Sequence, residues 1–144
     1  MTILAKNKVK IFKKPKSLPV KNSEIIDWFN DILLINSIAG VQLNIIFVTL
    51  PEIQNMNRKF RKKDKPTDVI TFSMVEGKFT QYSYDMLGDI YVCPDYIKAK
   101  DSKSVLRRLI HGLLHLLGND HKGESDLRKF IGLEEKYLKL IKLD

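Results

Sequence analysis

Hydrophobic positions recur along the chain with two different periods, and these periods predict where strands and helices form. Residues 8–12 alternate lysine with apolar side chains, which is typical of an edge strand with a basic outer face. Residues 43–48 are nearly all apolar, as in a buried strand. The apolar runs at 69–74 and 87–93 predict two more strands, each following a polar loop.

Four other segments have the spacing of amphipathic helices. Ser23 is a candidate cap for a helix closed by Gly40, with an apolar face of Ile25, Ile26, Phe29, Ile32 and Leu33. Thr49 and Glu52 form a capping box, which predicts a short helix that ends before Pro66. Helices are also expected over about 102–117 and 125–141. The last should bury Leu127, Phe130, Ile131, Leu138 and Ile141.

This order of elements predicts an α+β fold in which a small mixed β-sheet packs against helices. With 144 residues and no repeat, we expect a single domain over 1–144. No apolar run approaches the length of a membrane span and no cleavable signal pattern is present, so we expect a cytoplasmic protein without a membrane partner. The single Cys93 fits a reducing compartment and should be a small buried hydrophobic residue.

Positive charge is the main compositional bias, with a net charge of +8. It gathers in three places: six lysines in the first sixteen residues, a second cluster, and a third run of Lys98, Lys100, Lys103, Arg107 and Arg108. We name the second the 58–65 basic cluster, which consists of Arg58, Lys59, Arg61, Lys62, Lys63 and Lys65. Such runs are often only solvated surfaces, but three of them on a small domain favour a polyanionic partner, nucleic acid above all.

The three histidines of the chain, His111, His115 and His121, lie within eleven residues. His111 and His115 are four apart and share one face of a helix, whereas a continued helix would turn His121 away. Gly118 can end the helix, and Asn119 and Asp120 can form a turn that brings His121 back. A lone histidine is more often structural, but three at this spacing predict one zinc ion on this helix and the following turn. Three protein ligands leave the fourth position open, which is a catalytic arrangement.

The spacing of these histidines, with Gly118 between the last two, resembles the metzincin signature H-E-x-x-H-x-x-G-x-x-H. The resemblance implies a zincin-like fold. A metzincin peptidase carries a glutamate that takes the proton from water, and Gly112 stands at that position here. A metal-dependent peptidase is therefore an alternative that lacks its general base.

Three blocks of sequence resemble the YbeY family of bacterial endoribonucleases and rRNA maturation factors. Residues 111–121 match its motif H-G-x-L-H-L-x-G-Y-D-H except at Asn119. Residues 56–72 resemble its L-N-x-x-Y-R and PTDVLSF segments, and residues 87–90 its L-G-D-I strand. The match is close over about 50–121 and looser in the first third and the last helix.

The resemblance implies zinc-dependent cleavage of single-stranded RNA, in the maturation of ribosomal RNA and in ribosome quality control. Its implied partners are an rRNA precursor and the ribosome or small-subunit proteins. It also implies that His111, His115 and His121 bind zinc and that Arg61 is important for function. A non-catalytic RNA- or ribosome-binding factor, whose zinc only braces the fold, is the alternative from a different class.

Phosphodiester cleavage suggests roles for the residues around such a site. Zinc on three imidazoles can lower the pKa of water to about 7 or polarise a phosphoryl oxygen. Arg61 can hold phosphate oxygens through two parallel bonds, unless it only caps or pairs on its helix. Asp120 is either a proton shuttle or imidazole partner, or a turn former. Asn57 and Asp68 flank Arg61 and either orient it or hold the helix and loop.

The 58–65 basic cluster is the predicted RNA-binding surface, because it flanks Arg61 and contains a single acid, Asp64. Asp89 lies in a predicted strand, where we expect it to hydrogen-bond to a loop.

Overall fold

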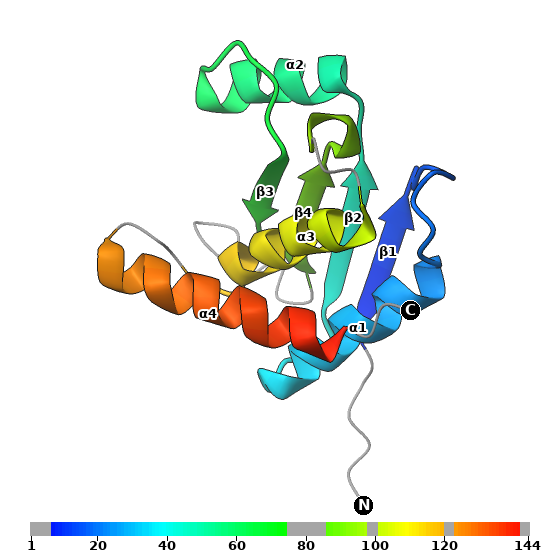
Figure 1. Cartoon of the computed structure of the whole chain (residues 1–144), viewed down its shortest axis with the longest axis vertical. Coiled ribbons are helices and arrows are strands. Elements are labelled where there is room, and N and C mark those ends of the chain that lie inside the picture. Colours follow the sequence, from blue (N-terminus) through cyan, green and yellow to red (C-terminus); the bar gives the residue numbers. More distant parts are fainter. Residues whose placement is uncertain (1–6, 75–85, 98–100, 120–122, 142–144) are drawn as a thin grey trace, which may run out of the picture.

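The computed structural model describes residues 7–74, 86–97, 101–119 and 123–141 (Figure 1). Its strands are β1 (Lys8–Phe12), β2 (Gln42–Phe47), β3 (Val69–Ser73) and β4 (Met86–Val92). Its helices are α1 (Asn22–Ile35), α2 (Leu50–Arg61), α3 (Ser102–Leu116) and α4 (Glu124–Leu140), with a short 3-10 helix over Pro94–Tyr96. No helix in these ranges is both long and apolar enough to cross a membrane.

The strands form one mixed sheet in the order β1-β2-β4-β3. β1 pairs parallel with β2, β2 pairs parallel with β4, and β3 pairs antiparallel with β4. In the register of the parallel strands, Ile45 on β2 lies between Ile11 and Ile90. The predicted α+β class, the mixed sheet and the edge position of β1 are therefore confirmed.

The two faces of the sheet are covered differently. Residues from α1, α3 and α4 form a single core cluster with the strands, and Figure 1 shows α3 crossing the sheet with α4 beside it. On β4, Ile90 and Val92 point into this cluster. Tyr91 points the other way, into a smaller cluster around Ile53 of α2 and the fully buried Cys93. Burial raises the pKa of the Cys93 thiol, in agreement with its predicted role as a small hydrophobic residue.

Local signals place α2 as predicted. The Thr49 hydroxyl accepts a hydrogen bond from the Glu52 backbone N–H at 3.3 Å, and the Glu52 carboxylate accepts one from the Thr49 backbone N–H at 3.1 Å. Lys62 then takes a left-handed conformation, with φ of 58°, and ends the helix. In Figure 1, α2 lies beyond the C-terminal ends of β2 and β4.

The first helix differs from its prediction at both ends. Its N-cap is Lys21, so that Ser23 lies inside the helix, and it ends at Ile35 rather than near Gly40. The Asn36 side chain donates to the Ile32 carbonyl at 2.7 Å, and Ser37 has a φ of 61°. The Asn36 side chain thus caps a carbonyl in the last turn of the helix, and the left-handed conformation of Ser37 ends the helix before Gly40.

A further expectation, about the buried side chains of the last helix, is wrong. Leu127 and Ile131 of α4 are 43% and 45% exposed, because only the narrow face carrying Phe130, Tyr137 and Leu138 packs against the core. Asp89 accepts a hydrogen bond at 2.9 Å from Asn44 on the neighbouring strand β2, and its expected bond to a loop stays a prediction. Strand pairing places these two polar side chains opposite each other on the same face.

Candidate active site

The helix α3 presents His111 and His115 on one face, one turn apart. The Nε2 atoms of the two imidazoles lie 3.2 Å from each other. The helix begins with the Asp101 side chain accepting a hydrogen bond from the Ser104 backbone N–H at 2.7 Å. It ends at Leu116, and Gly118 follows with a φ of 91° and donates to the His115 carbonyl at 3.0 Å. The predicted helix and its glycine stop are thus confirmed.

The spacing of the two nitrogens fits a shared metal ion. Two imidazole nitrogens bound to one tetrahedral zinc, each about 2.05 Å from it, would lie about 3.3 Å apart. Within the described ranges, no group of three metal-ligating side chains is present. The third predicted ligand, His121, and the candidate proton shuttle Asp120 lie outside the described residues.

Two residues of α4 line the histidine pair. The Phe130 ring is buried, and its centroid lies 4.7 Å from that of His111 and 5.1 Å from that of His115. One turn later, the Glu134 carboxylate lies 3.6 Å from the Nδ1 atom of His111, and the Glu134 side chain is only 8% exposed. The apolar pattern of α4 predicts a core position for Phe130, whereas Glu134 was missed. Its signal was a carboxylate four residues from Phe130, on the apolar face of the helix.

Gly112 lies between the histidines but faces the sheet. A Cβ atom at this position would lie 2.9 Å from Ile90 Cγ2 and 3.1 Å from Thr71 Cγ2, closer than most side chains tolerate. The glycine therefore allows α3 to pack tightly on β3 and β4. A glutamate here would push the helix away from the sheet, which is a second reason, besides the missing base, to disfavour a peptidase.

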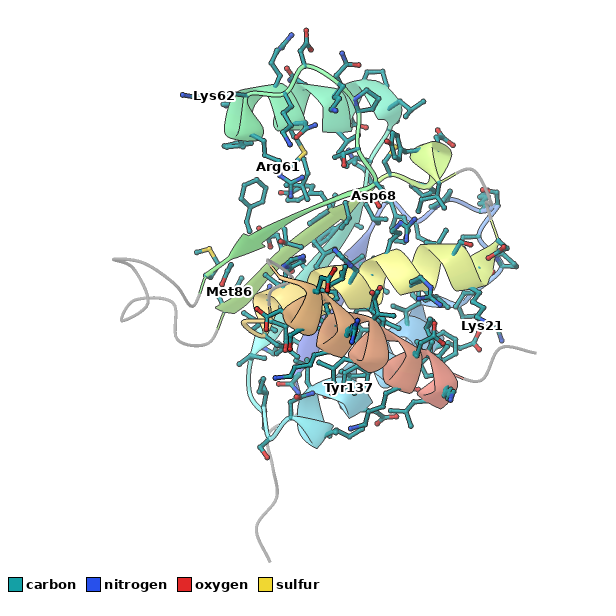
Figure 2. The ribbon with its side chains drawn as sticks, turned by 60° about the vertical axis from the view of Figure 1, so that its left-hand side comes forward. Lys21, Arg61, Lys62, Asp68, Met86 and Tyr137 are labelled. Carbon is teal, nitrogen blue, oxygen red and sulfur yellow. The ribbon has the colours of Figure 1, made fainter. Side chains whose placement is uncertain are left out.

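Arg61 is in the last turn of α2 with an exposed side chain. It makes no hydrogen bond or ion pair with any residue that the structure describes. In Figure 2, Arg61 lies between α2 and the sheet, whereas Lys62 points out past the end of the helix. The C-terminal ends of α2 and α3 both lie toward the β3 side of the sheet in Figure 1. The end of α2 that carries Arg61 and the half of α3 that carries the histidines therefore lie toward the same edge of the sheet.

Asn57 and Asp68 hold the segment between α2 and β3. The buried Asn57 amide donates to the Lys65 carbonyl at 2.8 Å. The Asp68 carboxylate accepts from the Val69 backbone N–H at 2.8 Å, and its other oxygen lies 2.7 Å from Nε of Arg108, as an ion pair rather than an aligned hydrogen bond. Neither side chain hydrogen-bonds to Arg61. The contacts therefore favour the alternative in which Asn57 and Asp68 hold the helix and the loop and do not orient Arg61 directly.

The basic clusters differ in how far their charges are paired. In the third run, Arg107 pairs with Glu135 and Arg108 with Asp68. The hydrogen bond from Arg107 also lowers the pKa of Glu135. By contrast, every member of the 58–65 basic cluster is exposed, and none forms an ion pair among the described residues. Their charges remain available to a polyanion.

Aromatic rings lie next to this cluster. Phe60 is 55% exposed, and the Lys59 ammonium lies 5.4 Å from the centroid of its ring. Phe60 packs edge-on against Phe72 with centroids 5.0 Å apart, and Phe72 packs in the same way against Tyr91 at 5.7 Å. An exposed aromatic side chain beside cations is typical of surfaces that bind single-stranded nucleic acid.

Two hollows lie along α3. One of about 290 Å³ is lined by Gly118, Asn119 and Phe130, together with Asp126 and Lys129, and so adjoins the ring that packs on both histidines. The other, of about 800 Å³, lies at the N-terminal half of α3 and includes the paired Arg107 and Arg108. Among the described residues, neither histidine lines either hollow, but only the smaller hollow is lined by Phe130, whose ring packs against both imidazoles. We therefore place the candidate site at the smaller hollow.

The chain is similar to proteins of one family over nearly its whole length. The family model described as Endoribonuclease YbeY matches residues 10–142. A relative named Endoribonuclease YbeY from Sulfurihydrogenibium sp. (strain YO3AOP1) is 34% identical over 139 residues, with 91% of this chain and 90% of the relative covered. One of the same name from Aquifex aeolicus is 33% identical over 146 residues, with 96% and 95% covered.

A solved structure supports the same relationship. The solution structure of TM1509 from Thermotoga maritima superimposes with a TM-score of 0.60 and 28% sequence identity, and the match covers 92% of this chain and 88% of that protein. The family model, the curated relatives and this structure agree on the same extent of chain. The chain therefore belongs to the YbeY family of endoribonucleases.

Proposed function

We propose that this protein is a zinc-dependent, single-strand-specific endoribonuclease that acts in the maturation of ribosomal RNA and in ribosome quality control. The observation that carries the proposal is the pair of Nε2 atoms 3.2 Å apart on α3, at the spacing of two ligands of one zinc ion. His111, His115 and His121 hold one ion per chain in this proposal. When bound, zinc can supply Lewis-acid stabilisation of the charge that develops on a phosphoryl group.

The side chains of the protein supply the remaining parts of the proposed site. Arg61 binds phosphate oxygens, because its exposed guanidinium has no partner among the described residues and is always charged. Asp120 moves a proton next to its sequence neighbour His121. Asn57 and Asp68 support the site indirectly, by holding the segment between α2 and β3.

The substrate lies along the 58–65 basic cluster in this proposal. Its unpaired cations attract the phosphate backbone, and Phe60 offers a ring face on which an unpaired base can stack. A base inside a duplex cannot reach such a ring, which accounts for a preference for single strands. The partners are an rRNA precursor and the ribosome or its small-subunit proteins, and the proposed location is the cytoplasm.

The test compares the wild-type protein, the same protein stripped of metal, and His115→Ala. All three are offered a structured rRNA precursor and a panel of peptides. We expect about one zinc per wild-type chain, cleavage of RNA that is lost on metal removal and returns with zinc, and no peptide cleavage. His115→Ala should neither bind zinc nor cleave RNA, with its helix content by circular dichroism unchanged.

Other outcomes would contradict the proposal in different ways. RNA cleavage that survives both metal removal and His115→Ala would point to a contaminating nuclease. If the zinc-loaded wild type binds RNA but does not cleave it, the alternative of a non-catalytic RNA- or ribosome-binding factor would be favoured. Cleavage of peptides would favour the alternative of a metal-dependent peptidase.

A further inference from the structure

We infer that Glu134 is a positioning residue, which holds the imidazole of His111 so that its Nε2 atom faces the metal. The inference rests on the proposed zinc site and adds to it a residue outside the three histidines. Glu134 comes from α4, whereas His111 comes from α3, so the two meet only through the packing of these helices.

The two nitrogens of the His111 ring have different neighbours. Nε2 faces the Nε2 atom of His115 at 3.2 Å, and Nδ1 faces the carboxylate of Glu134 at 3.6 Å. An imidazole that binds a metal through Nε2 carries its hydrogen on Nδ1, where a carboxylate attracts it. Since 3.6 Å exceeds a hydrogen-bond distance, the contact is electrostatic. It favours the tautomer in which Nε2 can bind the metal.

The burial of Glu134 points to the same role. A carboxylate on a side chain that is only 8% exposed loses most of its hydration and needs a compensating partner. Among the described residues, its polar partner is Nδ1 of His111, and no lysine or arginine pairs with it. Phe130, one turn earlier on the same face, packs against both imidazoles and limits their rotation. Together the two side chains brace the histidine pair from one side.

The next residue along the chain provides a matched control. Glu135 has a side chain that is 47% exposed and pairs with Arg107, away from the imidazoles. Glu134→Gln and Glu135→Gln therefore remove the same charge from neighbouring positions of one helix. Only the first removes it from the environment of His111.

The experiment measures zinc affinity of the full-length protein by competition with a chromogenic chelator. We expect Glu134→Gln to bind zinc about 10- to 100-fold more weakly than wild type, and Glu135→Gln to bind as wild type does. At saturating zinc, Glu134→Gln should regain most of the RNA cleavage, because it does not touch the substrate. A purely structural role would lower the melting temperature of the metal-free protein and leave zinc affinity unchanged, and this result would overturn the inference.

A second measurement on the wild type does not depend on any variant folding. Long-range ¹H–¹⁵N NMR of the zinc-loaded protein should show that His111 is metallated at Nε2 and protonated at Nδ1. Metallation at Nδ1 would overturn the inference. If the wild type and Glu134→Gln bind zinc with equal affinity, the role of Glu134 is contradicted but the proposed zinc site is not. If the wild type binds no zinc, the proposed site is contradicted as well.

Discussion

The histidine pair on α3 and the 58–65 basic cluster, which begins in the last turn of α2, lie toward the same edge of the sheet, yet they are supported in opposite ways. His111 and His115 are packed against Phe130 and Glu134 on α4, and Gly112 brings their helix into close contact with the sheet. The cations of the basic cluster are exposed and have no ion-pair partners among the described residues.

This difference follows from what each region has to bind. A metal ion requires its ligands at fixed distances and angles, so the ligand-bearing helix has to be held on several sides. Phosphate groups are attracted over about 10 Å at about 0.1 M salt, and long side chains can adjust to them. The first region should therefore respond to small steric changes and the second to charge and salt.

The largest expected effect comes from Arg61, the member of the basic cluster that is proposed to bind the reacting phosphate. Arg61→Glu should lower kcat/KM for RNA cleavage about 100-fold, because it removes a donor to the reacting phosphate. Zinc content should stay at the wild-type level, since the residue is on a different helix from the histidines. Arg128→Glu, the same charge reversal on α4, is the control and should change kcat/KM little. Equal losses in both variants would show that only net charge matters.

An intermediate effect is expected from the glycine that seats α3 on the sheet. Overpacking at Gly112→Ala costs about 1–3 kcal/mol, and the better helix propensity of alanine returns up to about 1 kcal/mol. We therefore expect the free energy of unfolding, measured in urea, to fall by about 1 kcal/mol.

Gly132→Ala is the matched control for this prediction. Gly132 is exposed on α4, and a Cβ atom there meets nothing within 4 Å. This variant should be slightly more stable than wild type, because only the helix propensity changes. If both variants gained stability, the packing of α3 on the sheet would not be as tight as the distances indicate.

The smallest effect is expected from the last two lysines of the basic cluster. Lys63→Gln combined with Lys65→Gln should weaken RNA binding several-fold at low salt. It should also reduce the slope of log K against log salt by about 0.7 for each phosphate that the protein no longer neutralises. Lys136→Gln with Lys139→Gln, on α4, removes the same charge elsewhere and should leave the slope closer to that of wild type. Identical slopes in the two double variants would place the bound phosphates outside the 58–65 basic cluster.

Elements with strong local signals could be predicted from the sequence. The capping box of Thr49 and Glu52 places the start of α2, and the alternation of residues 8–12 marks β1 as an edge strand. The end of α1 could not be predicted, because the Asn36 side chain competes for the last carbonyls of the helix. The buried face of α4 was only partly predicted, since Leu127 and Ile131 extend an apolar stripe that the core does not cover.

The sequence by itself determined the histidine pair, because the period of a helix sets which residues four apart share a face. It also determined the glycine at which that helix ends, since Gly118 takes the left-handed conformation. Only the tertiary structure decided that Glu134 faces His111, that Asp68 pairs with Arg108, and that Gly112 touches β3 and β4. These interactions join separate elements, and local periodicity does not specify which helix faces meet when the chain packs.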